Sequence, residues 1–200
     1  MSASSNFGNM FSVVGGSWFL PFVPMAPIQI LINNLLYDFS QTGIPTDRVD
    51  EEYLTTPRKW NIGNIRRFMF WIGPVSSIFD YATFFMMLYI FKCWVADAFH
   101  EQLFHTGWFV ESLLTQTLIV HIIRTNRIPF FQSRASGAMT LTTMLVMAIG
   151  IVLPFSPLAK SFGFVAPPKL YWFLLVGILV IYSLLTHLVK TWFIKKYGSD

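Results

Sequence analysis

LYWFLLVGILVIYSLLTHLVKTWF, residues 170–193, is an almost unbroken apolar stretch near the end of a chain of 200 residues. Its single formal charge is Lys190, close to the C-terminal end of the stretch. A helix that crosses a bilayer needs about 20 consecutive, mostly apolar residues. This stretch therefore predicts a transmembrane helix and places the chain among membrane proteins.

Similar stretches occur along the rest of the sequence. Full-length candidates for membrane helices cover residues 22–40, 68–91, 108–123 and 138–154, and a partial candidate covers 6–20. The sequence thus predicts an all-α fold, a polytopic helical membrane bundle of five full spans and one partial N-terminal span. We expect helices with the candidate ion site in 1–40, a loop in 41–67, four C-terminal helices in 68–193 and a tail in 194–200.

The composition supports a membrane location. Hydrophobic residues make up 54% of the chain and charged residues 12%, whereas soluble domains carry about 25% charged residues. The lipid bilayer is therefore the expected partner of the apolar surface. The net charge of +4 is too small and too scattered to predict a nucleic-acid partner. A single cysteine, Cys93, excludes a disulfide framework within this chain.

The basic residues predict the direction of the spans. Eleven of the 14 lysines and arginines fall in segments 41–67 and 124–136 and at the C-terminal end. Loops rich in lysine and arginine stay on the cytoplasmic side of a membrane. We therefore expect a cytoplasmic C-terminus, and external loops around Pro21, in 95–107 and in 155–168.

The second span carries a carboxylate. Asn34 and Asp38 are four residues apart, so they share one helical face. An aspartate inside a membrane costs about 2.5–3.5 kcal/mol on insertion scales and usually has a function. Intramembrane amides also simply bond neighbouring helices, and Asp38 at the cytoplasmic interface would be solvated. The spacing alone leaves an ion site and these structural roles open.

Neighbouring residues add further oxygen ligands. Pro21, Pro24 and Pro27 lack the backbone N–H, which frees carbonyl groups one turn earlier. Asn6 and Asn9 in the partial helix add two more amides. Hard divalent cations such as Mg²⁺ take oxygen ligands of this kind, and Mg²⁺ keeps several of its waters. The segment thus contains the donors that a divalent cation requires.

Three other polar residues are weaker metal candidates. Asp80 lies mid-span, where a hydrogen bond between packed helices is the favoured interpretation over ion contact. Glu111 is predicted one turn inside the outer interface, as a solvated or exit-side charge. Gln116 lies deeper and is expected to bond a neighbouring helix.

The motifs resemble those of a known family. PIQILINNLLYD at 27–38 resembles the pattern P-x-Q-x-L-x-x-N-L-x-x-D in the sixth transmembrane helix of cation-pumping P-type ATPases. SSNFGN at 4–9 resembles the fifth-helix segment S-S-N-x-G-E of calcium pumps. The whole chain is most similar to bacterial magnesium-transporting P-type ATPases, notably in TPRKW at 56–60, FWIGP at 70–74, SIFD at 77–80, GWF at 107–109 and QSRA at 132–135.

The resemblance implies the C-terminal membrane part of such a pump, from late helix five to helix ten. It implies cation ligands at Asn6, Asn9, Asn34 and Asp38. Asn9 departs from the glutamate of the calcium pumps, which favours one loosely held ion over two. The transported ion would be Mg²⁺, imported across a bacterial inner membrane.

The resemblance also implies a partner. ATP would be used by a preceding part of the pump that carries the motif D-K-T-G-T, which this sequence lacks. The chain alone is therefore expected to be inactive. The alternatives are a self-standing multi-pass scaffold or assembly subunit, with Asp38 and Asp80 as packing groups, and a passive channel.

Overall fold

The computed structural model describes residues 2–47, 62–95, 97–125, 129 and 132–197, with the backbone alone at 2–6, 62, 64, 65, 69 and 197. These residues form helices and no extended strand, which confirms the predicted all-α class. The long helices are α1 (Ser2–Phe19), α2 (Pro27–Ser40), α3 (Ile62–Tyr89), α4 (Ala98–Ile123), α5 (Gly137–Val152) and α6 (Lys169–Tyr197). Short 3-10 turns are η1 (Gln41–Thr46), η3 (Leu153–Phe155) and η4 (Lys160–Phe162).

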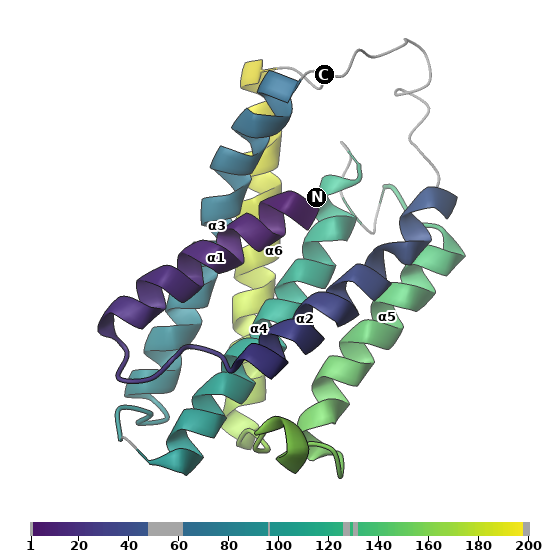
Figure 1. Ribbon diagram of the computed structural model, residues 1–200. Coiled ribbons are helices and arrows are strands. Elements are labelled where there is room, and N and C mark those ends of the chain that lie inside the picture. Colours follow the sequence, from purple (N-terminus) through teal and green to yellow (C-terminus); the bar gives the residue numbers. More distant parts are fainter. Residues whose placement is uncertain (1, 48–61, 96, 126–128, 130–131, 198–200) are drawn as a thin grey trace.

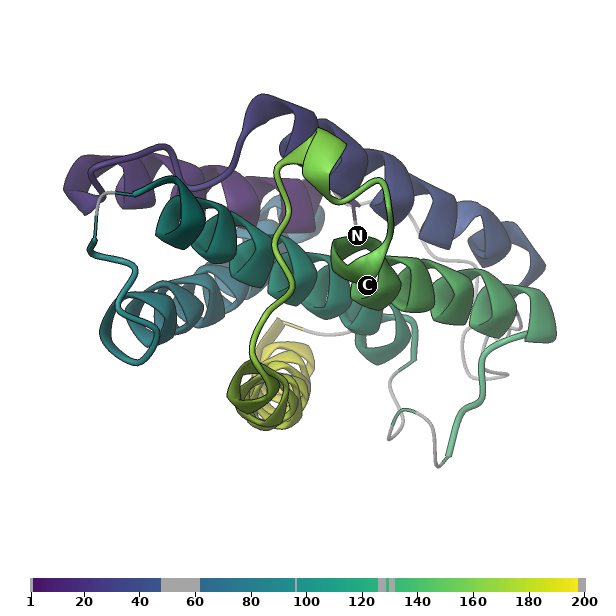
Figure 2. The same ribbon diagram turned by 90° about the horizontal axis from the view of Figure 1, so that it is seen from below.

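Helix α4 lies at the centre of the bundle. Successive helices run in opposite directions (Figure 1), and an orthogonal view shows α4 between the layer of α1 and α2 and the helix α6 (Figure 2). Nearly all of α4 is buried, whereas most of α5 and α6 faces outward. Residues on α4 are therefore the ones that can contact several other helices at once.

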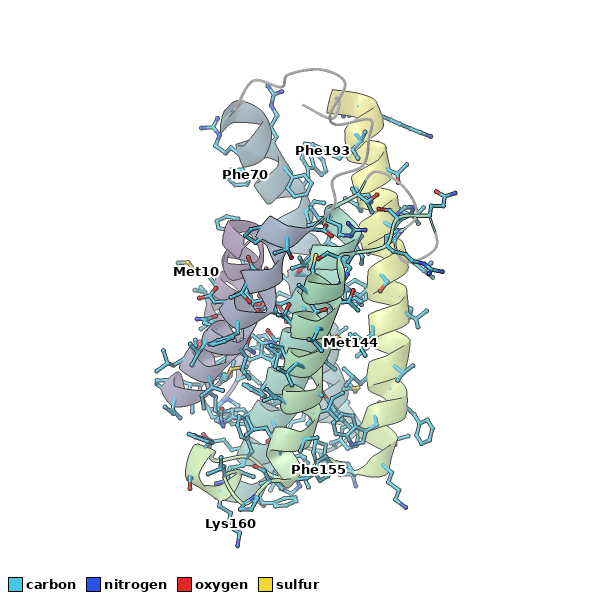
Figure 3. The ribbon with its side chains drawn as sticks, turned by 90° about the vertical axis from the view of Figure 1, so that its right-hand side faces the viewer. Met10, Phe70, Met144, Phe155, Lys160 and Phe193 are labelled. Atoms are coloured by element: carbon cyan, nitrogen blue, oxygen red, sulfur yellow. The ribbon has the colours of Figure 1, made fainter. Side chains whose placement is uncertain are left out.

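Three helices are long and apolar enough to cross a membrane: Ala98–Ile123, Gly137–Phe155 and Lys169–Lys196. The outward surface of α5 includes Met144, which faces the viewer in Figure 3. Lipid solvates such side chains, so a membrane removes the penalty that water would impose on them. Helix α2 has only 14 residues, whereas a membrane-crossing helix needs about 20. It is therefore shorter than the full span that the sequence predicted for 22–40.

The start of α2 differs from the prediction for a physical reason. The helix begins at Pro27 rather than near residue 22. Proline is well suited to the first helical position, because an N–H at that position would make no hydrogen bond within the helix. The side chain of Gln29 reaches back and accepts a hydrogen bond from the N–H of Ala26, 3.1 Å away. Residues 20–26 are consequently a non-helical link between α1 and α2.

The start of α4 is also earlier than predicted. The sequence placed an external loop at 95–107, but the helix begins at Ala98. Asp97 caps it, since its carboxylate accepts a hydrogen bond from the backbone N–H of His100 at 2.8 Å. That hydrogen bond lowers the pKa of Asp97. The prediction was wrong here because the polar residues of this segment lower its hydropathy below that of a membrane span, although the segment is helical.

Charged contacts tie the helices together at the end where α2 and α4 finish. Arg124 pairs with Asp47 at 2.6 Å, and the other carboxylate oxygen of Asp47 accepts a hydrogen bond from the N–H of Ser136 at 2.7 Å. The buried ammonium of Lys190 donates to the carbonyl oxygen of Ile122 at 2.8 Å. These contacts join η1, the end of α4, the start of α5 and α6.

Parts of two predicted segments fall outside the described residues. In the predicted loop 41–67 these are residues 48–61, while 41–46 form η1 and 62–67 belong to α3. In the predicted tail 194–200, residues 194–197 continue α6 and 198–200 are outside the description.

Candidate cation site

A cavity of about 180 Å³ lies between α1, α2 and α4. A water molecule takes about 30 Å³ in the liquid, so the cavity has room for an ion that keeps several waters. Its lining consists of Asn9, Met10 and Val13 on α1, Met25 in the link, Ile30, Asn33 and Asn34 on α2, and Trp108 and Ser112 on α4.

Asn33 has a buried amide oxygen that accepts no hydrogen bond from the described part of the chain. Its side chain is 2% exposed, and its amide N–H donates to the carbonyl oxygen of Phe109 at 3.4 Å. Within the described part of the chain, no group donates a hydrogen bond to its Oδ1. A buried acceptor without a partner costs about 1–3 kcal/mol. A cation or an ion-bound water in the cavity would remove that cost.

A second row of polar groups runs from α1 into α4. The hydroxyl of Ser112 donates to Oδ1 of Asn9 at 3.5 Å, and the amide of Gln116 donates to the Ser112 hydroxyl at 2.8 Å. The predicted interhelical bond of Gln116 is thus a bond within α4 instead. Its contribution to the cavity is to orient Ser112.

The structure brings some of the predicted ligands together and separates others. Asn9 and Asn34 line the same cavity, as the predicted site requires. Asn6 belongs to α1, and its side chain is outside the described residues. Asp38 lies one turn beyond Asn34 on an exposed flank of α2, together with exposed Leu35. The carboxylate is therefore beside the cavity and does not line it.

Asp80 lies behind the wall of the cavity. It is 2% exposed, and it accepts hydrogen bonds from the hydroxyl of Ser12 at 2.5 Å and from the indole N–H of Trp108 at 2.7 Å. These bonds join α1, α3 and α4, in agreement with the packing role that the sequence favoured.

The prediction that Glu111 is a solvated charge near the outer interface was wrong. The side chain is fully buried. Because α4 begins at Ala98 rather than at Trp108, Glu111 lies in the middle of this helix and faces other helices.

The donor set of the cavity is neutral. Three amides and one hydroxyl line it, and among the described residues no three His, Cys, Asp or Glu side chains gather into a metal-binding group. The sequence analysis did not predict Asn33 as a ligand, because it selected residues four apart on one helical face, which are Asn34 and Asp38. The two consecutive asparagines at 33 and 34 were the feature that could have indicated it.

Comparison with known proteins gives consistent results. The family described as "Cation transporting ATPase, C-terminus" matches residues 22–192. The "Magnesium-transporting ATPase, P-type 1" of Salmonella typhimurium strain LT2 is 52% identical over 199 residues, which is 100% of this chain and 22% of that protein. The protein with the same description from Escherichia coli K12 is 52% identical over 198 residues, 99% of this chain and 22% of that protein. The chain thus spans about a fifth of the length of these relatives.

Proposed function

Because the chain belongs to the family of C-terminal regions of cation-transporting ATPases, we propose that it forms the C-terminal membrane part of a pump that uses ATP to import Mg²⁺. The pump lies in a bacterial inner membrane, with the C-terminus of this chain in the cytoplasm. ATP is bound and hydrolysed by the rest of the pump, and the ion crosses the membrane beside α1, α2 and α4.

The cavity between these helices is the observation that carries the proposal. Asn9, Asn33 and Asn34 supply amide oxygens, and the Oδ1 of Asn33 has no donor in the described chain. Mg²⁺ dehydrates reluctantly and is bound through few protein oxygens together with several waters. A cavity of about 180 Å³ with sparse neutral ligands suits such an ion.

Asp38 supplies the charge that the cavity lacks. It is exposed on α2, one turn from Asn34. An exposed carboxylate on a membrane helix is costly unless it faces protein or a water-filled path. We infer that other helices of the pump pack against this flank of α2. Asp38 and Asn34 then face the ion together. Asn6 and Asn9 flank the same ion from α1.

The test is a set of substitutions in the intact pump. We expect Asp38→Asn to abolish Mg²⁺-dependent phosphoenzyme turnover, because the amide keeps the shape but loses a Coulomb attraction that is large at low dielectric. Asn34→Ala should weaken the apparent affinity for Mg²⁺ by about tenfold, which corresponds to 1.4 kcal/mol. Growth of a strain deficient in magnesium uptake reports transport, and membrane levels of each variant exclude misfolding.

Control variants separate the ion site from general damage. Glu101→Gln, on a partly exposed carboxylate of α4, should transport normally, and Asp80→Asn should be milder than Asp38→Asn. Normal transport by Asp38→Asn together with a dead Asp80→Asn would place the ion at α3 and contradict the proposed site.

A further inference from the structure

The segment that connects α5 with α6 crosses the end of the bundle where Lys160 lies (Figure 3). We call residues 160–167 the outer strap, which includes η4. In the end-on view of Figure 2, the strap runs from the start of α2 past α4 to the start of α6. Residues 164–168 belong to no helix or strand, so this part can move without unwinding a regular element. The proposed orientation places this end of the bundle outside.

One buried side chain of α2 is bonded to the outer strap. Gln29 is 1% exposed, and its amide nitrogen donates to the carbonyl oxygens of Phe162 at 2.9 Å and Gly163 at 3.3 Å. Its amide oxygen accepts a hydrogen bond from the N–H of Ala26, which fixes the orientation of the amide. Gly163 has a φ of 69°, in the left-handed region that favours glycine. The strap therefore turns at the point where Gln29 holds it.

Two further contacts hold the outer strap on α4. The backbone N–H of Val165 donates to the hydroxyl of Thr106 at 3.0 Å, and Thr106 is fully buried. The ring of Phe164 is buried against Phe109, with 4.6 Å between the ring centroids. The carbonyl oxygen of Phe109 accepts the hydrogen bond from Asn33. The strap thus packs on a residue that also anchors a side chain of the cation cavity.

The outer strap borders a second cavity. This outer cavity has a volume of about 330 Å³, and its lining includes Phe162 and Gly163 of the strap and Gln29 of α2. Ile30, the next residue of α2, lines the cation cavity. At about 30 Å³ for each water, the outer cavity has room for a hydrated cation. The first turn of α2, to which the strap is bonded, therefore separates two cavities that both have room for an ion.

The attachments of the outer strap allow its release. A hydrogen bond between protein groups contributes a small net free energy, because water replaces the partner when the bond breaks. Gln29 and Thr106 hold the strap through bonds of this kind. Segments that move during function come from the parts of a protein whose local opening costs little.

We propose that the outer strap is the external gate of the cation cavity and that Gln29 holds the gate closed. When Gln29 and Thr106 release the strap, it leaves the first turn of α2, and the outer cavity connects with the cation cavity. This inference rests on the proposed function in two respects: the cavity between α1, α2 and α4 holds the ion, and this end of the bundle lies outside.

Access to the cation cavity from outside tests the gate in the intact pump, in spheroplasts. Val13 lines the cavity and is not one of its oxygen donors, so Val13→Cys in a Cys93-free background is the reporter. We expect an impermeant thiol reagent added outside to modify this cysteine slowly. Gln29→Leu keeps a side chain of similar size but removes two hydrogen bonds to the strap, so modification should become roughly tenfold faster.

Two further variants show whether the strap is responsible. Thr106→Val removes the other hydrogen bond to the strap and should also accelerate modification. Gln102→Leu is the matched control, because Gln102 lines the same outer cavity, whereas the side chains bonded to the strap are Gln29 and Thr106. Its rate should equal that of the reporter alone. An unchanged rate in both Gln29→Leu and Thr106→Val would overturn the proposal, as would an equal acceleration in Gln102→Leu.

Native Cys93 distinguishes opening of the gate from unfolding of the outer end. In Gln29→Leu without the reporter, we expect buried Cys93 to react as slowly as in wild type, and fast modification would overturn the proposal. The labelling does not require transport. Faster labelling in a pump that does not bind Mg²⁺ would support the gate and contradict the magnesium function, whereas unchanged labelling in a pump that transports Mg²⁺ would contradict the gate alone.

Discussion

Asn33 and Asn34 are adjacent on α2, yet both border the cavity. Neighbouring residues on a helix point about 100° apart, so the pair spreads its two amides around one side of the cavity. Asn33 is buried toward α4 and bonds the carbonyl oxygen of Phe109, whereas Asn34 is half-buried toward the open flank that carries Asp38. The doubled asparagine therefore links the inner and outer parts of the candidate site.

Cys93 gives a residue-scale prediction about reactivity. The side chain is 0% exposed in the link between α3 and α4, and burial raises the pKa of its thiol to about 12, helped by the nearby charge of Asp97. Only the thiolate is a strong nucleophile. We expect alkylation of folded protein to be slow at neutral pH and to keep rising with pH far beyond 9, whereas detergent-denatured protein should react with an ordinary thiol profile. Equal rates in the folded and denatured states would contradict the burial of Cys93.

At the scale of elements, close approach of α1 and α3 depends on glycine. A Cβ atom at Gly8 would lie 2.9 Å from the carbonyl oxygen of Gly73, whereas one at Gly177 on α6 meets no atom within 4 Å. Small residues at such crossings let membrane helices pack closely and gain dispersion energy. The carbonyl of Gly8 also accepts a hydrogen bond from Ser77 at 2.9 Å.

We expect Gly8→Ala to lower the free energy of unfolding by about 1–3 kcal/mol, because overpacking against backbone forces α1 and α3 apart. Gly177→Ala is the matched control and should be neutral or stabilising, since alanine favours a helix over glycine by about 1 kcal/mol. Thermal unfolding in detergent measures both. Equal stability of the two variants would show that α1 and α3 are not in close contact.

The elements also show how far sequence reasoning reached. Hydropathy identified the α5 and α6 spans within a few residues, because both are apolar around most of their surface. It failed at the start of α4, where polar residues face other helices rather than water, and so Glu111 was misplaced. The amides of Asn9 and Asn34 were predicted from spacing and resemblance. Their meeting with Asn33, Trp108 and Ser112 depends on the crossing of α2 with α4, which no local pattern encodes.

For the whole molecule, alternating helices give two distinct ends. Figure 3 shows Lys160 and Phe193 at opposite ends of the bundle. In a Cys93-free background of the intact pump, we expect an impermeant thiol reagent added outside to label Lys160→Cys and to leave Tyr197→Cys unlabelled until the membrane is opened. This follows from the excess of basic residues on the side of the C-terminus. Labelling of position 197 from outside would reverse the proposed orientation.

Binding of Mg²⁺ to the purified intact pump tests the central claim most directly, because it needs neither ATP hydrolysis nor transport. Equilibrium dialysis should compare wild type with the double variant Asn33→Leu/Asn34→Leu, and with Leu31→Ala, an exposed position on the same helix, as control. We expect the double variant to lose at least about tenfold in affinity, since it removes two oxygen ligands from the cavity, while Leu31→Ala binds as wild type does. An unchanged affinity and stoichiometry in the double variant would show that the cavity between α1, α2 and α4 does not hold the ion.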